Sequence, residues 1–412
     1  MSQVNITVNY EEVIALLSKD RSEAFGYLME RILNEFLLTE SEEQIGAAKH
    51  ERTAERSDYR NGTRERPLVT RIGTITLRVP RHRDVPFVTM VFDNYQRSEA
   101  ALLTTMMEMV IQGVSTRKVT KVVEELCGTS FSKSTVSELC KRMDEGIKEF
   151  KNRKLTIPYP FVITDAKYFK VRENHRIVSK ALMVAMGITE DGRREIIGFD
   201  AYEIESAQTW KEFLTSLKER GLTKMNMVTS DAHSGLIAAL KEVFPQVPWQ
   251  RCQYHFLKNI LDQTPKKAQA GLQSELREMF TAETIEDARR RRDEIIKDYE
   301  DVAEKAMETL DEGFEDAMTV MLLPEKMRIP LRTSNYVERE NGELGRRYNA
   351  IRIFPNTASL IRLMGAVLVE RHDILSSRRP LFSKQKYDNA IKDITPQLIE
   401  IANEQVKLLK AA

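Results

Sequence analysis

Residues 161–172 read FVITDAKYFKVR, residues 180–189 read KALMVAMGIT and residues 195–202 read EIIGFDAY. These three runs are short and apolar, and the turn signals Asn174 and Asp191-Gly192 separate them. Short apolar runs bounded by turn residues are typical of buried strands. The stretch therefore predicts a three-stranded meander, in which each strand pairs with the next.

The residues after this meander alternate between helix and strand patterns. Ser206 can cap a helix that Gly221 ends. A buried strand, a second helix and a short final strand follow, over residues 225–231, 235–244 and 248–255. A meander followed by alternating helices and strands predicts a mixed α/β fold, in which helices flank a mixed sheet. With acidic residues at strand ends, this is the plan of an RNase H-like nucleotidyl-transfer core.

The rest of the chain is mainly helical in pattern. Apolar residues recur at three- and four-residue spacing over residues 10–38, and charged residues at helical spacing fill residues 259–326. Ser115 can cap a first helix, Ser132 or Ser134 can cap a second, and Gly128 breaks the helical pattern between them, which is the pattern of a helix-turn-helix. Helix pairs of this kind also occur in proteins that never contact DNA.

The composition indicates a soluble protein of several structural units. The chain has 412 residues, 42% of them hydrophobic, and no run of apolar residues long enough to span a membrane. Its first residues lack the features of an export signal, and its three cysteines, Cys127, Cys140 and Cys252, are widely spaced and odd in number. We therefore expect reduced thiols, a cytoplasmic location and no membrane partner.

Charge is unevenly distributed along the chain although the net charge is only +1. Residues 51–83 hold nine arginines against four acidic residues, and residues 346–388 hold nine basic residues against three acidic ones. Such patches suit the phosphates of nucleic acid, and an ordinary solvated surface explains either patch equally well. Arg289 to Arg292 lie among acidic residues at helical spacing, so we interpret that run as a solvated helix face.

Three acidic residues are candidates for a metal site. Asp165 lies within an apolar strand pattern and Asp231 ends the fourth strand, so both can reach one ion if those strands are adjacent. Glu338 starts a helix after the helical block. Structural alternatives exist, because Asp231 can cap the next helix and Asn335 with Glu338 fits a capping box. As metal ligands, the three carboxylates suit two Mg²⁺ or Mn²⁺ ions that promote in-line displacement at phosphorus.

Cys252 and His255 form a Cys-x-x-His pair at the end of the predicted fifth strand. A structural zinc site needs four ligands, and the chain has no second Cys/His pair at suitable spacing. Packing or hydrogen bonding beside the metal site is therefore favoured over zinc. His255 can act there as a phosphate contact or as a group that holds a metal ligand in place.

Several ordered motifs resemble those of the bacterial IS256 insertion-sequence transposases, which are related to the eukaryotic Mutator-like group. The anchors include DYRNGTRERPLVTRIGTITLRVPRHR (58–83), ITDAKYFKVRE (163–173), VTSDAHSGLIAALKEVFP (228–245), WQRCQYHFLKN (249–259) and TSNYVERENGELGRRYNAIRIFPNTASLIRLMGAVLVE (333–370). In that family, two aspartates and the glutamate of an Asn-x-x-Glu-Arg motif form the catalytic triad. The resemblance places this triad on Asp165, Asp231 and Glu338, and the family's Cys-x-x-His signature on Cys252 and His255.

The resemblance implies a DDE transposase. Such an enzyme binds the terminal inverted repeats of its insertion sequence, nicks DNA to release a 3′ hydroxyl and transfers that strand to target DNA, here by a copying route through a circular intermediate. Its substrate is double-stranded DNA and not a small molecule. Holding two DNA ends favours a homodimer, bacterial and cytoplasmic, and nucleoid-associated when bound to DNA. The expected DNA contacts are Arg60, Arg64, Arg66, Arg81, Arg83, Lys133, Arg339, Arg346 and Arg347.

These expectations divide the chain into six segments. They are an N-terminal helical dimerisation region (1–50), an arginine-rich extended segment (51–95), a helix-turn-helix DNA-binding domain (96–150), the first part of the catalytic core (155–258), an all-helical insertion (259–328), and the second part of the core with C-terminal helices (329–412).

Three features depart from the family pattern. Lys167 stands where a small hydroxylated residue is expected, Gly342 and Gly345 interrupt the basic run after the glutamate, and the family's tryptophan after Glu370 is missing. A nuclease or resolvase on the same scaffold and a DNA-binding regulator derived from a transposase are alternatives. A third is a structural oligomer whose carboxylates serve as caps and salt-bridge partners.

Overall fold

The computed structural model describes residues 21–48, 51, 56–70, 73–89, 100–127 and 132–411. The chain forms two compact units, residues 1–142 and 143–412. The division falls inside the segment 96–150, because α6 (Met143–Asn152) packs within the second unit against α14 (Thr357–Ser377). Arg362 of α14 donates two hydrogen bonds of 2.6 and 2.7 Å to Asp144 of α6.

The first described element of the first unit is α2 (Arg21–Ile45), which packs on a two-stranded antiparallel sheet of β1 (Arg60–Thr70) and β2 (Gly73–His82). In the arginine-rich extended segment, the turn signals Asn61-Gly62 and Pro67 and the alternating run 72–79 predict turns and one short strand, whereas the structure has two paired strands. Gly62, with φ +75°, lies where the pairing register shifts, and a two-stranded sheet has free edges on which proline is tolerated. The predicted helical residues before Arg21 lie outside the described residues.

Three helices complete the first unit: α3 (Ala100–Ile111), α4 (Thr116–Cys127) and α5 (Lys133–Lys141). Their buried apolar side chains form one small core, which includes Met106, Val119 and Val136. Ser132 caps α5 as predicted, since its side chain accepts a hydrogen bond from the backbone of Thr135. The predicted helix break at Gly128 lies outside the described residues.

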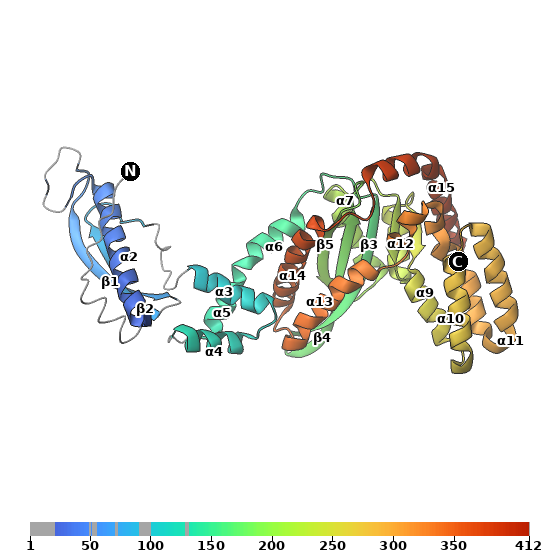
Figure 1. Ribbon diagram of the computed structural model, residues 1–412, viewed down its shortest axis with the longest axis horizontal. Coiled ribbons are helices and arrows are strands. Elements are labelled where there is room, and N and C mark those ends of the chain that lie inside the picture. The colour runs from blue at the N-terminus through green and yellow to red at the C-terminus, as the bar shows by residue number, and fades with distance from the viewer. Residues whose placement is uncertain are drawn as a thin grey trace. The chain divides into compact units, whose positions relative to one another are not determined.

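The second unit is built on a five-stranded sheet with the strand order β5-β4-β3-β6-β7 (Figure 1). The strands are β3 (Phe161–Glu173), β4 (Arg176–Ile188), β5 (Arg194–Tyr202), β6 (Met227–Ser230) and β7 (Trp249–Arg251). β3, β4 and β5 pair antiparallel in sequence order, which confirms the predicted meander. β6 runs parallel to β3, and β7 runs parallel to β6, so the sheet is mixed and the α/β prediction is confirmed.

Helices cover both faces of this sheet. α7 (Ala207–Glu219) and α8 (Ser234–Val243) bury Trp210, Phe213 and Leu240 against one face. α13 (Asn335–Ile351) and α14 lie on the other face, beside β3 and β5 (Figure 1). Side chains alternate along β3, so that Val162 joins the core under α7 and α8 while Phe169 meets Tyr348 of α13.

The predicted helical block follows β7. It consists of α9 (Gln253–Asp262), α10 (Lys266–Phe280), α11 (Ile285–Met318), a 3-10 turn (Thr319–Leu322) and α12 (Glu325–Leu331). These elements surround a core of their own, and α11 is interrupted at Ala303. The block leaves the sheet and returns to it at one place, because Gln253 N donates to Arg332 O at 3.0 Å and Ser334 N donates to Cys252 Sγ at 3.3 Å.

The last helix, α15 (Lys384–Ala411), completes the edge of the sheet at β7. Trp249 N donates to Gln405 Oε1 at 2.9 Å, and Gln405 Nε2 donates to Trp249 O at 2.8 Å. One buried carboxamide thus takes the place of a neighbouring strand residue. Gln405 also accepts a hydrogen bond from Lys241 and donates one to Asp316. Of the helices in the described part of the chain, none combines the length and apolar character needed to cross a membrane.

Candidate active site

β3 and β6 bring Asp165 and Asp231 to the same level of the sheet. The parallel pair is in register at Ile163 and Thr229, and each aspartate follows its register residue by two positions. Adjacent strands are about 4.8 Å apart, so the two carboxylates lie near each other. Asp165 is still within β3, as predicted, whereas Asp231 comes directly after β6.

Asp165 is half-buried beside a second negative charge. Burial, and then the charge of Asp231, raise the pKa of Asp165 to about 6. Two hydrogen bonds oppose this shift: Ala166 N donates to Asp165 Oδ1 at 2.9 Å, and Asn341 Nδ2 donates to Asp165 Oδ2 at 2.7 Å. A carboxyl group whose pKa is raised by burial and by a specific charged neighbour is a candidate for a functional site.

Asp231 is not a helix cap. The residue that caps α8 is His233, whose Nδ1 accepts a hydrogen bond from Leu236 N at 3.3 Å. The strand before Asp231 is held by Trp249, whose Nε1 donates to Ser230 Oγ at 2.9 Å. The capping alternative for Asp231 is therefore wrong, and its carboxylate is left for another role.

Glu338 lies in the first turn of α13. The predicted capping box with Asn335 does not form, because the N-cap is Ser334 and no side-chain cap hydrogen bond is present. Ser334 Oγ instead donates to Glu338 Oε1 at 2.6 Å, and the same oxygen lies 3.7 Å from His255 Nε2. Glu338 is thus held by side chains at the junction of α9 and α13.

Cys252 and His255 belong to α9 rather than to a strand. β7 ends at Arg251, Cys252 is the N-cap of α9, and His255 lies in the first helical turn. A hydrogen bond with the Cys252 thiol, and then the nearby carboxylates of Glu338 and Asp231, raise the pKa of His255 to about 9 against the effect of burial. Burial raises the pKa of Cys252, but hydrogen bonds from His255 and Ser334 outweigh it, so the pKa is lowered. His255 is therefore positively charged at neutral pH.

The carboxylates fall into two neighbouring groups. Within the described residues, Cys252, His255 and Glu338 present ligand atoms that all lie within 4.8 Å of one another, and this group includes neither aspartate. Three ligands are one fewer than a structural zinc site needs. Asp165 and Asp231 form the second group, and Asn341 of α13 joins it through its hydrogen bond to Asp165.

The basic residues expected to contact DNA in the first unit differ in their surroundings. Arg64, Arg81 and Arg83 are exposed along the β1–β2 hairpin, and Lys133 is exposed at the first residue of α5. Arg60 is tied to its own unit, since it pairs with Glu42 and donates to the carbonyls of residues 47 and 48. Arg66 lies in β1 and is partly buried.

The three expected contacts on α13 also differ. Arg339 is exposed, and its guanidinium carbon lies 5.9 Å from the centre of the Tyr336 ring. Arg346 is exposed and pairs with Glu343 at 3.1 Å. Arg347 has a side chain only 4% exposed and pairs with the same carboxylate at 2.6 Å. Burial and pairing give Arg347 a structural role in this arrangement.

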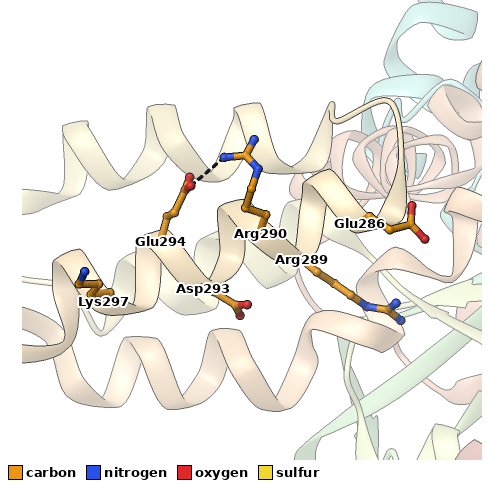
Figure 2. Close-up of a pocket in the computed structure, with 6 residues that line it drawn as sticks. All are labelled: Glu286, Arg289, Arg290, Asp293, Glu294 and Lys297. Atoms are coloured by element: carbon orange, nitrogen blue, oxygen red, sulfur yellow. Dashed lines mark hydrogen bonds and ion pairs between the residues drawn. The ribbon is translucent and has the colours of Figure 1, made fainter.

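The arginine run on α11 is a solvated helix face, as predicted. Arg289 pairs with Glu315 at 2.9 Å, and Arg290 pairs with Glu294 at 2.7 Å. Figure 2 shows the shallow hollow on this surface and the Arg290–Glu294 pair beside it. Arg291 and Arg292 are likewise paired with acidic residues. The charges of the four arginines are therefore compensated locally.

Sequence reasoning missed three residues of the site: Ser334, Asn341 and Lys167. Lys167 Nζ donates to the backbone oxygen of Asn341 at 2.6 Å, and it packs against Gly345, where an added Cβ would lie only 2.7 Å from that nitrogen. Two departures from the family pattern, Lys167 and Gly345, therefore fit together, because the glycine leaves room for the lysine ammonium. The signal for Asn341 was its position one turn after Glu338, which places both side chains on one face of the helix.

A mixed α/β fold with two aspartates on neighbouring strands, Asp165 within β3 and Asp231 directly after β6, and a glutamate on a covering helix defines a protein with an acidic centre. Residues 1–377 match the sequence model of the family described as Transposase, Mutator family, and the chain belongs to that family. Membership makes the protein an enzyme that cuts and transfers DNA, with DNA as its partner.

Curated relatives agree with this assignment. The chain is 44% identical over 385 residues to the transposase for insertion sequence element IS256 in transposon Tn4001 of Staphylococcus aureus, covering 92% of this chain and 98% of the relative. It is 43% identical over 342 residues to the transposase for ISRM5 of Rhizobium meliloti, covering 83% of this chain and 86% of the relative. The transposase for IS1081 of Mycobacterium tuberculosis is 35% identical over 364 residues, which cover 87% and 88%.

Proposed function

We propose that this transposase binds the terminal inverted repeats of an insertion sequence and catalyses metal-dependent cleavage and strand transfer through Asp165, Asp231 and Glu338. The observation that carries the proposal is the register of β3 and β6, which brings two aspartates from distant sequence positions to one level of the sheet. The meander followed by parallel strands, with α13 laid across β3, supports an RNase H-like core.

The residues present fit Mg²⁺ or Mn²⁺, with two ions per site. The donors around Asp165 are oxygens, which these hard cations prefer, and a buried amide oxygen of Asn341 lacks a hydrogen-bond partner. Asp165, Asp231 and Glu338 would hold the ions. When bound, such ions activate the attacking oxygen and stabilise the leaving oxygen at phosphorus.

The side chains of the site have distinct roles in this proposal. Asp165 must lose its proton to hold a cation, and its pKa of about 6 in the metal-free protein means that protons compete with the cation as the pH falls below that value. Glu338 Oε1 accepts the hydrogen bond of Ser334, which leaves Oε2 as the oxygen that would hold a cation. His255, positively charged beside Glu338, can contact a phosphate of the DNA strand, and Cys252 keeps it in that charge state.

DNA recognition is assigned to the first unit. α4 and α5 serve as the helix-turn-helix in this proposal, with Lys133 at the start of the second helix. Arg64, Arg81 and Arg83 contact phosphates, because they are exposed cations on one hairpin. Two DNA ends must be held together during transfer, so we propose a homodimer as the working assembly.

The test is Mg²⁺- or Mn²⁺-dependent nicking and joining of a labelled DNA that carries the element's end. We expect Asp165→Asn, Asp231→Asn and Glu338→Gln each to reduce the reaction at least 1000-fold, about 4 kcal/mol of transition-state stabilisation, while DNA binding in gel-shift experiments persists. Asp301→Asn is the matched control, because Asp301 is an exposed carboxylate of α11. Near-normal chemistry in any one of the three variants would remove that residue from the site.

Pre-cleaved DNA ends supplied with a target plasmid separate a transposase from a nuclease on the same scaffold. A transposase yields joined products, whereas a nuclease only cuts. A DNA-binding regulator would bind the ends and neither cut nor join them.

A further inference from the structure

We propose that Asn341 is a further ligand of the metal site: its side-chain oxygen joins Asp165 in holding the cation. The inference rests on the proposed metal-dependent function and deepens it, because it adds a neutral oxygen to the three carboxylates. It arises from the placement of Asn341 between α13 and β3.

Asn341 is fixed beside Asp165 from two directions. Its side chain donates to Asp165 Oδ2 at 2.7 Å, and its backbone oxygen accepts a hydrogen bond from Lys167 Nζ at 2.6 Å. Asp165 and Lys167 are two residues apart on β3, so their side chains lie on the same face of the strand. Both contacts anchor α13 at one residue.

The side-chain oxygen of Asn341 has no hydrogen-bond partner among the residues that the structure describes. Asn341 is 5% exposed, and its Oδ1 is buried without a hydrogen bond. A buried polar atom without a partner costs about 1–3 kcal/mol, so its persistence calls for a functional reason. An amide side chain in direct contact with a half-buried carboxylate offers the oxygen donors that a hard cation accepts.

The amide has two roles that depend on the cation. Without the cation, its N–H donates to Asp165 and offsets part of the negative charge. With the cation, rotation about the terminal torsion exchanges nitrogen for oxygen in nearly the same volume, because that torsion is roughly two-fold. Asn341 can therefore support Asp165 in both states, which an aliphatic residue cannot do.

The test measures Mn²⁺ binding by electron paramagnetic resonance on the full chain without DNA. We expect Asn341→Ala to weaken Mn²⁺ binding about tenfold, the size of effect seen for groups that orient or complete a metal site. Asn349→Ala should bind as the wild type does, because Asn349 is an exposed asparagine on the same helix. Equal Mn²⁺ affinity of Asn341→Ala and the wild type would overturn the proposal.

Asn341→Asp separates a ligand from a residue that merely positions Asp165. A ligand role predicts Mn²⁺ affinity at least equal to that of the wild type, since an oxygen is retained and a charge is added. A positioning role through the N–H predicts affinity as low as that of Asn341→Ala, because the new carboxylate repels Asp165 and donates nothing. That second result would overturn the proposal.

Asp165→Asn distinguishes failure of this inference from failure of the proposed function. If Asp165→Asn binds Mn²⁺ as tightly as the wild type, the metal site itself is wrong and the role of Asn341 falls with it. If Asp165→Asn loses binding while Asn341→Ala keeps it, only the role of Asn341 is wrong. Thermal melting in EDTA shows whether each variant is folded.

Discussion

The two glycines of α13 should respond in opposite ways to replacement by alanine: Gly342→Ala should stabilise the protein and Gly345→Ala should destabilise it. Gly342 is exposed, and a Cβ added there meets nothing within 4 Å. A Cβ added to Gly345 would lie 2.7 Å from Lys167 Nζ. Because Gly342 and Gly345 lie in one helix and neither has a positive φ, the two substitutions differ mainly in this contact.

The expected magnitudes follow from two opposing effects. Alanine stabilises a helix interior by about 0.5–1 kcal/mol relative to glycine, and Gly342→Ala should show this in full. In Gly345→Ala, the lysine must withdraw and lose its hydrogen bond to Asn341 O. A hydrogen bond from a charged group contributes about 1.5–3 kcal/mol. The net effect of Gly345→Ala is therefore a destabilisation of about 1–2 kcal/mol.

Urea unfolding followed by tryptophan fluorescence measures these effects directly. The chain has two tryptophans, and both Trp210 and Trp249 are buried in the second unit, so the signal reports on the unit that contains α13. In a Lys167→Thr background, Gly345→Ala should become stabilising by about 0.5–1 kcal/mol, because no ammonium is displaced. If Gly345→Ala stabilises the wild type as much as Gly342→Ala does, the lysine yields without cost and the reasoning is refuted.

Two further substitutions test the electrostatics and the sheet edge. Asp165→Asn should stabilise the metal-free protein by up to about 3 kcal/mol at pH 8 and by about half as much at pH 5. The folded pKa of about 6 lies above the ordinary value of 3.8, so the stability that proton binding provides is complete below about pH 4 and lost as the pH rises through 6. Urea unfolding in EDTA at both pH values measures this dependence. An equal gain in the free energy of unfolding at pH 5 and pH 8 would contradict it. Gln405→Ala should destabilise the second unit by about 3–5 kcal/mol, because Trp249, Lys241 and Asp316 lose buried hydrogen-bond partners. The control is Gln397→Ala, at an exposed position of α15, which should change stability by less than about 0.5 kcal/mol. Comparable urea midpoints for the two glutamine variants would show that the sheet edge does not need the carboxamide.

The parts of the fold that could be predicted are those with a local pattern. The meander, the alternation that follows and the helical block each repeat at the period of their own secondary structure, so no distant contact was needed to infer them. β1 could not be inferred in this way, because its pairing with β2 overrides the turn signals at Gly62 and Pro67.

The residues of the candidate site also divide into those that a local sequence pattern marks and those that only distant contacts reveal. Asp165 lies within one apolar run and Asp231 ends another, so each acidic residue is visible in the sequence. Asn341 is an ordinary residue of a polar helix, and its contact with Asp165 joins residues 176 positions apart. Nothing local marks that contact, and the complementarity of Lys167 and Gly345 likewise appears only when α13 lies on β3.

The helical block from α9 to α12 is joined at its two ends, and this has an evolutionary consequence. The backbone bond between Gln253 and Arg332, together with the contact between Cys252 and Ser334, ties both ends of the block at the point where the chain leaves the sheet. Closing a longer or shorter loop at fixed ends changes the free energy only slowly with length. Insertions and deletions in the turns of the block that leave its core intact should therefore accumulate among relatives without disturbing the register of β3 and β6, and these turns are the place to look for differences in length.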